Sequence, residues 1–236
     1  MGRPVGRLLG AGRTADVYEL DEAWVLRRDR EGWGDALAEG AVMAHVRDHG
    51  YPAPGVRLAD SSGTDLVMQR LAGPTMLGAL SAGTMGAEEA GGILARLLRQ
   101  LHEVPARRPG GSILHLDLHP DNVILTTGGP YVIDWNNTEE GDPGLDWGTS
   151  AVILAQVAVG GEPIAEPARA ILAALLTDPS HLTDDGLTEA LRRRAANPTM
   201  TPTEVELLGE ADELIRSFML DQPSALGGHS GPHTAT

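Results

Sequence analysis

Apolar and polar residues follow different patterns on the two sides of residue 70 in this 236-residue chain. On the N-terminal side, short apolar segments separated by turn residues are typical of strands, and one helical pattern ends at Gly50 before Pro52 and Pro54. The predicted strands and helix are Val5–Leu9, Val17–Leu20, Trp24–Arg28, Val56–Ala59, Leu66–Gln69 and the helix Gly34–His49. This part therefore predicts a small antiparallel sheet with one helix.

The segment 70–75 reads RLAGPT, and its Gly-Pro pair predicts a hinge. Beyond it, apolar residues recur at helical spacing, and Asp184 and Thr203 are candidate N-caps, Thr203 with a capping box to Glu206. The predicted helices are Ala87–His102, Asp146–Val159, Ile164–Leu176, Thr183–Ala196 and Thr203–Met219. The prediction is an α+β chain of two lobes, a sheet lobe over 1–70 and a mostly helical lobe over 71–222, with a disordered tail over 223–236.

The net charge of −15 changes the range of partners that we expect. Nucleic acids and anionic membranes are polyanions, so an acidic protein is not expected to bind either. A cationic substrate is compatible with this charge, and so is a charge that only keeps the protein soluble. The chain has no cysteine, which excludes disulfides and thiolate catalysis. The most apolar segment, Ala151–Val159, is too short to span a bilayer, and we expect a cytoplasmic protein.

The densest polar cluster of the chain is HLDLHPDN, residues 115–122. An apolar segment, a Gly-Gly-Pro turn and a second apolar segment follow it, and the second segment ends at Asp134. A hairpin of this kind would return Asp134 to a place beside Asn122 and near Asp117. Phosphoryl transfer needs such a set, because a carboxylate orients the attacking hydroxyl and oxygen ligands hold Mg²⁺. A solvated polar turn is the alternative interpretation of the cluster.

The sequence HLDLHPDNVIL, followed by VIDW, resembles the aminoglycoside phosphotransferase and choline-kinase-like families, which have a bilobal protein-kinase-like fold. The resemblance implies that Asp117 is the catalytic base, that His115 braces the loop, and that Asn122 and Asp134 bind Mg²⁺. It also implies that Asp146, which directly precedes an apolar helix, caps this helix and anchors the catalytic loop. His119 is expected either to contact substrate or to pack within the loop.

The resemblance also implies a nucleotide site in the N-terminal lobe. Gly10 and Gly12 resemble a glycine-rich loop that lets the backbone approach phosphates, although a plain β-turn is the alternative. Arg27 stands where such kinases carry a lysine, and it can clamp phosphates or be a surface cation. Glu39 shares a helical face with apolar residues and is the expected ionic partner of Arg27. The site is completed by main-chain groups that would bind the purine of ATP or GTP, those of Gln69 and Leu71.

Together these features predict a magnesium-dependent kinase that phosphorylates a hydroxyl of a small molecule. An aminoglycoside-like cationic compound is one candidate acceptor. The alternative is a catalytically weak nucleotide-binding regulator, because Arg27 and the incomplete glycine motif depart from the kinase pattern. Acidic residues that could bind a cationic acceptor, or be plain surface charges, are Glu162, Glu166, Asp184 and Asp185.

Overall fold

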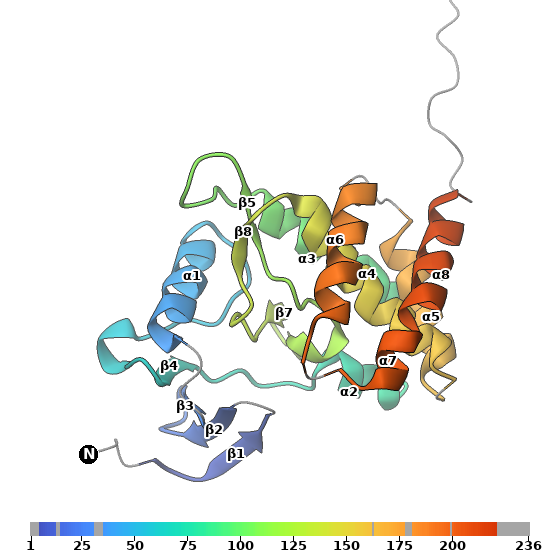
Figure 1. Ribbon diagram of the computed structural model, residues 1–236. Helices are drawn as coiled ribbons and strands as arrows, with labels where there is room; N and C mark the ends of the chain where they lie inside the picture. The colour runs from blue at the N-terminus through green and yellow to red at the C-terminus, as the bar shows by residue number, and fades with distance from the viewer. Residues whose placement is uncertain are drawn as a thin grey trace, which may run out of the picture.

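The N-terminal part of the computed structural model is an antiparallel sheet of four strands in the order β1-β2-β3-β4. The structure describes residues 5–12, 15–30, 35–161, 163–177, 181–198 and 200–220. The strands are β1 (Leu8–Ala11), β2 (Ala15–Glu19), β3 (Trp24–Asp29) and β4 (Asp65–Gln69). Figure 1 shows this sheet at one end of the molecule, away from most of the helices.

The predicted strand Val56–Ala59 is wrong. Val56 makes only an isolated bridge to Met68, and the chain then turns into a short 3₁₀ helix, η1 (Leu58–Asp60). The reason is local hydrogen bonding, since the carbonyls of Arg57 and Leu58 accept the N–H groups of Asp60 and Ser61. These two carbonyls are therefore not available for a ladder with β4.

Helix α1 (Ala36–Asp48) packs beside the sheet. Its N-cap is Asp35, whose side chain accepts from the N–H groups of Leu37 and Ala38, and the predicted start at Gly34 lies outside the described residues. The buried face of α1 combines Val42, Met43 and Val46 with one carboxylate, that of Glu39. This face agrees with the stripe that the sequence predicted.

Helices make up most of the chain after the hinge, as expected (Figure 1). Two short β-pairs, β5–β8 and β6–β7, lie between α3 and α4. The elements are α2 (Met76–Ser81), α3 (Ala87–His102), β5 (Ser112–Leu114), η2 (Pro120–Asn122), β6 (Val123–Thr126), β7 (Gly129–Val132), β8 (Glu139–Gly141), α4 (Pro143–Val159), α5 (Ala165–Leu175), α6 (Asp184–Ala195), α7 (Pro202–Glu206) and α8 (Leu208–Leu220). The predicted α+β fold is thereby confirmed.

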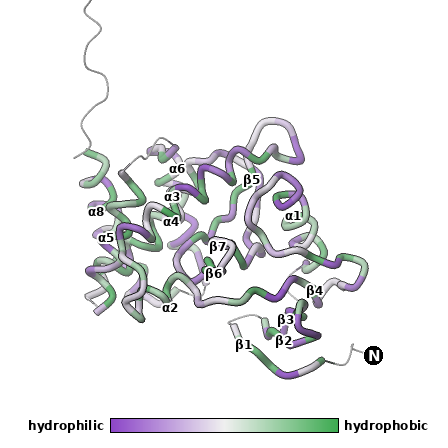
Figure 2. The backbone as a smooth tube through the Cα atoms, turned by 180° about the vertical axis from the view of Figure 1, so that it is seen from behind, coloured by the Kyte–Doolittle hydropathy of each residue, from purple (hydrophilic) through white to green (hydrophobic). Residues whose placement is uncertain are grey.

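Helix α4 is the centre of the helical part, because α5, α6 and α8 all pack against it. Figure 2 shows apolar stretches along these helices where they face one another. The contact between α4 and α6 is close enough to require glycine. A Cβ atom on Gly186 would lie 2.3 Å from the backbone carbon of Gly144. This contact fixes where α6 runs relative to the start of α4.

Four predicted helix boundaries need correction. The N-cap of α6 is Thr183 and not Asp184, and the capping box joins Thr201 to Glu204 two residues earlier than predicted. A proline at N1 places both α7 and α4 earlier than the apolar pattern does. The predicted helix Thr203–Met219 is two helices, α7 and α8. Asp142 and not Asp146 caps α4.

The predicted tail, residues 223–236, lies outside the described residues. Within the residues that the structure describes, no helix is long and apolar enough to cross a membrane.

The hinge between the sheet and the helical part passes very close to the β6–β7 hairpin. The N–H of Leu125 donates to the carbonyl of Pro74 at 2.9 Å, and Thr75 forms a bridge with Ile124. Gly73 has a φ of 150°, and a Cβ atom there would lie 1.9 Å from the carbonyl oxygen of Leu125. The hinge can therefore take this path only with glycine at position 73.

We predict that Gly73→Ala lowers the free energy of unfolding by about 1–3 kcal/mol, because the added methyl group forces the backbone apart. Thermal and denaturant unfolding measure the change. The matched control is Gly128→Ala in an exposed turn, where the nearest atom to the new Cβ would be 3.6 Å away. Equal stability of the two variants would contradict the close approach.

Candidate active site

The polar cluster and Asp134 meet through the β6–β7 hairpin, as the sequence predicted. Val123 pairs with Val132, and the N–H of Ile133 donates to the carbonyl of Asn122 at 3.0 Å. Asn122 therefore lies directly opposite the residue before Asp134.

Asp117 is held between two neighbours from its own loop. The Nδ2 atom of Asn122 donates to the carbonyl of Asp117 at 2.8 Å and to its Oδ2 at 3.2 Å. His119 Nε2 lies 3.7 Å from the other carboxylate oxygen, and His119 Nδ1 accepts from the N–H of Asp121. The ring of His119 is thus turned towards Asp117 by a bond within the loop.

Burial raises the pKa of Asp117, and the carboxylate of Asp134 raises it further. The charges of His119, His115 and Arg194 oppose this rise. The pKa of His119 is lowered, mainly because the same burial disfavours its charged form. Asp117 and Asp134 therefore lie close enough to feel each other's charge in a partly dehydrated site.

Two residues in this site adopt a left-handed backbone conformation without being glycine. They are Leu116, with a φ of 60°, and Asp134, with a φ of 64°. Such conformations cost of order 1–3 kcal/mol each and persist only where neighbouring contacts impose them. Leu116 precedes Asp117, so the strain lies at the residues that aim the two carboxylates.

The contacts that hold Leu116 in its left-handed conformation come from Asp146. Its carboxylate is fully buried and accepts the N–H of His115 at 3.0 Å and the N–H of Leu116 at 2.7 Å. His102, at the end of α3, contacts the same carboxylate at 3.0 Å through Nε2. Asp146 therefore anchors the catalytic loop as expected, but from within the first turn of α4 and not from its N-cap.

His115 is fully buried beneath the loop and braces it from the other side. Its Nε2 lies 3.0 Å from the carbonyl of Ile133, and its ring meets that of Trp135 edge to face with centroids 4.9 Å apart. Tyr51, which follows α1, packs against the other part of Trp135 in the same way at 5.6 Å. This stack joins the end of α1 to the catalytic loop.

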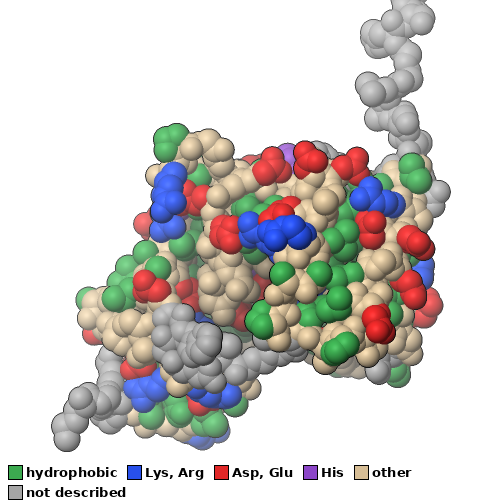
Figure 3. Space-filling view, in the orientation of Figure 1, with side chains coloured by type: hydrophobic (Ala, Val, Ile, Leu, Met, Phe, Trp, Pro, Cys, Tyr) green, Lys and Arg blue, Asp and Glu red, His purple; other side chains and the backbone are tan. Residues whose placement is uncertain are grey.

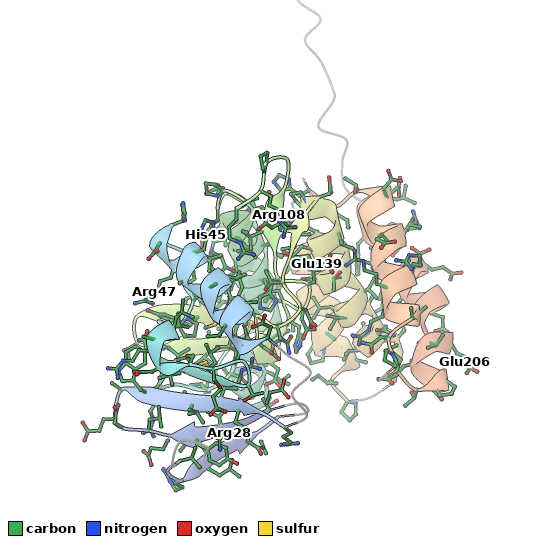
Figure 4. All side chains as sticks on the ribbon, turned by 60° about the vertical axis from the view of Figure 1, so that its left-hand side comes forward. Arg28, His45, Arg47, Arg108, Glu139 and Glu206 are labelled. Carbon is green, nitrogen blue, oxygen red and sulfur yellow. The ribbon has the colours of Figure 1, made fainter. Side chains whose placement is uncertain are left out.

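Arg27 and Glu39 form the ion pair that the sequence predicted, through Arg27 Nη2 and Glu39 Oε2. Both side chains are largely buried. Burial raises the pKa of Glu39 to about 7, although Arg27 and the N–H of Trp135 both favour its ionised form. The charge of Asp134 adds to the rise, so Glu39 faces the same site. Arg28, the next residue of β3 (labelled in Figure 4), pairs with Asp65 instead.

The remaining predicted nucleotide contacts lie along the edge of the sheet nearest the hinge and in the first turn. Gly10 lies opposite Val17 within the β1–β2 pair, and the N–H of Gly12 donates to the carbonyl of Ala15 at 2.8 Å. The N–H of Gln69 already donates to the carbonyl of Gly55 at 2.7 Å. A purine contact at Gln69 would therefore use its carbonyl oxygen. Leu71 follows β4 directly in the hinge.

The structure separates the other acidic candidates from this site. Asp184 lies at the start of α6, with its side chain 78% exposed, and pairs with Arg216. Asp185 is exposed beside it, Glu166 lies in the first turn of α5, and Glu162 lies outside the described residues.

His102, the partner of Asp146, was not predicted from the sequence. The signal was a histidine at the end of an apolar helical stripe, a position that is buried and needs a polar partner.

The comparison of sequences identifies the chain as a phosphotransferase. The model of the phosphotransferase enzyme family APH matches residues 5–112 and 105–184, so the chain belongs to this family. A search of curated proteins finds no match.

Solved structures of aminoglycoside phosphotransferases have the same fold. The gentamicin complex of APH(2'')-IIa is 12% identical, with a TM-score of 0.55 over 92% of this chain and 91% of that one. APH(2'')-Ib bound to ADP is 13% identical, with a TM-score of 0.53 over 89% and 92%. A thermostable APH(4)-Ia mutant with AMP-PNP and hygromycin B is 15% identical, with a TM-score of 0.51 over 91% and 95%. The predicted kinase-like fold is confirmed.

We predict that Asp146→Asn lowers the free energy of unfolding by about 1–3 kcal/mol or more. The new amide N–H₂ group would replace one carboxylate oxygen, and it cannot accept a hydrogen bond from the backbone N–H group that faces it. Unfolding measurements give the loss, and hydrogen exchange at His115 and Leu116 locates it. Asp185→Asn on the surface of α6 is the control. Unchanged exchange at the two loop amides would contradict the anchoring role.

The pKa of Glu39 rises from its usual 4.5 to about 7 in the folded protein. We therefore predict that Glu39 lowers the free energy of unfolding as the pH rises through this range. The folded state binds more protons than the unfolded state in this range, so the contribution is present at low pH and lost at high pH. In Glu39→Gln this slope is absent, and the difference in unfolding free energy between the two proteins shifts by about 1–3 kcal/mol between pH 5 and 7.5. The exposed Glu88→Gln is the control, and parallel pH curves for Glu39→Gln would refute the prediction.

Proposed function

We propose that the protein transfers the γ-phosphoryl group of ATP or GTP to a hydroxyl group of a small molecule. The observation that carries the proposal is that Asn122 donates to Asp117 and that the charge of Asp134 acts on both Asp117 and Glu39, the partner of Arg27. Positioning and charge stabilisation are what phosphoryl transfer requires of a protein.

In this proposal Asp117 is the catalytic base. The acceptor hydroxyl gives its proton to a carboxylate oxygen of Asp117 as its own oxygen bonds to the γ-phosphorus. The bond between the γ-phosphorus and the bridging oxygen breaks, and a nucleoside diphosphate leaves. Burial supports this role, because a carboxylate with a raised pKa is a stronger base. His115 is proposed as a positioning residue, since its buried ring contacts the carbonyl of Ile133 and the ring of Trp135.

Asn122 and Asp134 would hold Mg²⁺. The Nδ2 atom of Asn122 is committed to Asp117, and this orientation turns its oxygen away from Asp117 as a possible ligand. Among the described residues, no group of three or more histidine and carboxylate side chains is arranged to hold a metal. Two protein oxygens with water and nucleotide phosphates suit magnesium, which would neutralise phosphate charge. The chain's own part is to fix these two oxygens through the β6–β7 hairpin.

The nucleotide would bind under the sheet. Arg27, oriented by Glu39, would hold phosphate oxygens, and its planar guanidinium can do so with two hydrogen bonds. Gly10 and Gly12 would let the β1–β2 turn approach the phosphates. The carbonyl of Gln69 and the N–H of Leu71 would meet the purine edge. The solved structures of aminoglycoside phosphotransferases with ADP, ATP and AMP-PNP support a nucleotide co-substrate.

The acceptor is a hydroxylated small molecule. Solved relatives hold gentamicin, streptomycin or hygromycin B, so aminoglycosides are one class to test. The net charge of −15 supports partners other than nucleic acids or anionic membranes. The proposed reaction consumes ATP or GTP, which the cytoplasm supplies, and this supports a cytoplasmic location.

A regulator that binds nucleotide without turnover is the second candidate, because Arg27 replaces the lysine of related kinases. The ion pair between Arg27 and Glu39 favours the enzyme, since the substituted residue keeps a partner and a fixed orientation. Release of nucleoside diphosphate in the presence of magnesium separates the two. The assay screens hydroxylated amines, sugars and acids as acceptors.

We predict that Asp117→Asn lowers acceptor-dependent release of nucleoside diphosphate by about 10²–10⁴-fold, the usual contribution of a general base. Nucleotide binding, measured by thermal shift with magnesium, is expected to persist. Asp121→Asn is the matched control, because Asp121 is exposed and belongs to the same loop. Turnover that survives in Asp117→Asn would remove Asp117 as the base. No turnover and no nucleotide-induced shift in the wild type would overturn the kinase.

A further inference from the structure

A pocket of about 530 Å³ lies at the C-terminal end of α1, and the proposed phosphoryl transfer leaves it unused. Its lining residues all belong to the segment 23–69, so the pocket is separate from the catalytic loop. They come from the last turns of α1, from the loop after it, and from the ends of β3 and β4 that lie beside each other. Figure 4 shows one of them, Arg47, on the side of α1 that faces away from the helical part. A pocket of this volume suits a small molecule.

Two side chains with free hydrogen-bond donors meet in this pocket beside Gly55. Arg47 donates from Nη1 to the carbonyl of Ala53 at 2.8 Å, which leaves its Nε and Nη2 groups without a partner in the described chain. Gln69 accepts from the N–H of Gly55 at 3.2 Å through Oε1, and its Nε2 group is free among the described residues. A Cβ atom on Gly55 would lie 3.6 Å from Gln69 Oε1 and 3.7 Å from Arg47 Nε. The two side chains therefore lie next to the same point of the pocket.

Arg47 is a cation without a carboxylate partner in the part of the chain that the structure describes. Arginines of the sheet differ from it, since Arg27 pairs with Glu39 and Arg28 pairs with Asp65. Figure 3 shows the same pairing on the helical part, where Arg side chains lie beside Asp and Glu side chains. A planar guanidinium that is held in place and lacks an ion pair is suited to a carboxylate ligand.

The indole ring of Trp24 gives the pocket a flat apolar wall next to these donors. Trp24 is paired with Gln69 in the β3–β4 ladder, and paired residues carry their side chains on the same face of a sheet. The guanidinium of Arg57 lies 3.9 Å from the ring centroid and covers one face of the ring. Arg57 does not line the pocket, so the pocket meets another part of the ring. Such a surface favours a planar ring as the apolar part of a ligand.

One carboxylate, that of Asp48, also lines the pocket and bears on the charge of its ligand. Asp48 is exposed, and its side chain makes no hydrogen bond or ion pair with a residue that the structure describes. It can therefore turn to solvent, whereas Arg47 is held by Ala53 and lies against Gly55. A group that is already oriented loses less entropy on binding, so the fixed cation and not the free carboxylate selects the ligand.

We infer that this pocket binds a small aromatic carboxylate, and that the bound carboxylate strengthens the binding of nucleotide. The carboxylate group would accept hydrogen bonds from Arg47 and from Nε2 of Gln69, and the ring would pack against Trp24. The site is inferred from the pocket alone, whereas its effect on nucleotide rests on the proposed function.

The link between this pocket and the nucleotide is Gln69. Its main-chain N–H donates to the carbonyl of Gly55 at 2.7 Å, and its carbonyl oxygen is the group that would meet the purine. A ligand bonded to both Arg47 and Gln69 would tie the end of α1 to the end of β4 and hold this carbonyl in place. Ligand and nucleotide would then strengthen each other's binding by the same factor.

The first test is binding to the full chain, measured by titration calorimetry. The probes are benzoate, naphthoate and indole-3-acetate, and the matched neutral compounds are the amides of the same acids. We expect a Kd of about 1 mM or tighter for at least one probe, and binding at least about tenfold tighter than that of its amide. Failure of all three probes, or equal binding of acid and amide, would overturn the site. Equal binding of benzoate and cyclohexanecarboxylate would overturn the preference for an aromatic ring.

Substitutions then locate the bound probe. Arg47→Gln is expected to weaken its binding by at least about tenfold, and Arg47→Lys, which keeps the charge, should recover part of the loss. Ala44→Leu should also weaken binding, because it fills the pocket without a change of charge. Asp48→Asn should strengthen binding, because it removes a charge of the same sign as the probe. Arg96→Gln, an exposed position on α3, is the matched control. Unchanged binding in Arg47→Gln, or weaker binding in Asp48→Asn, would overturn the inference.

The second test is the coupling to nucleotide. The affinity for AMP-PNP with magnesium is measured with and without a saturating concentration of the tightest probe. We expect the probe to tighten it by about fivefold or more, and Arg47→Gln to abolish this gain while the affinity without probe stays the same. An affinity that the probe leaves unchanged or lowers would overturn the coupling. A protein that binds the probe through Arg47 but binds no nucleotide would keep the site and overturn the proposed function together with the coupling.

Discussion

The whole site depends on one buried carboxylate, that of Asp146. It holds two consecutive N–H groups of the catalytic loop and so imposes the left-handed conformation of Leu116, which in turn aims Asp117. A buried carboxylate is costly unless hydrogen bonds satisfy it, and here the loop and His102 supply them. The loop and the core of the helical part therefore stabilise each other. Loss of either would leave the other with unsatisfied polar groups.

A second constraint joins the sheet to this loop. Glu39 lies between Arg27 and the N–H of Trp135, so a single side chain of α1 contacts both the nucleotide side and the residue after Asp134. The ring contacts of Trp135 with Tyr51 and with His115 form a second link between the end of α1 and the loop. The position of α1 is thus coupled to the position of Asp134. A change that moved α1 would be expected to disturb both proposed ligand sites at once.

The cation that the sheet contributes to the proposed site belongs to an ion pair. Arg27 is paired with Glu39, and a guanidinium held in this way is suited to phosphate. The net charge of −15 gives no indication of this cation, because net charge does not describe the local charge of a site.

The sequence alone determined the fold class, the hairpin that returns Asp134 to the polar segment 115–122, and the pairing of Arg27 with Glu39. These follow from local patterns: a helical stripe with one carboxylate, and a polar loop followed by a strand, a turn and a strand. Tertiary structure decided the rest. A proline shifted the caps of α4 and α7, so Asp146 entered the helix, and the hydrogen bonds of 57–61 replaced a strand. The crossing of α4 and α6 depends on Gly144 and Gly186, a contact between residues far apart in the chain that no local pattern encodes.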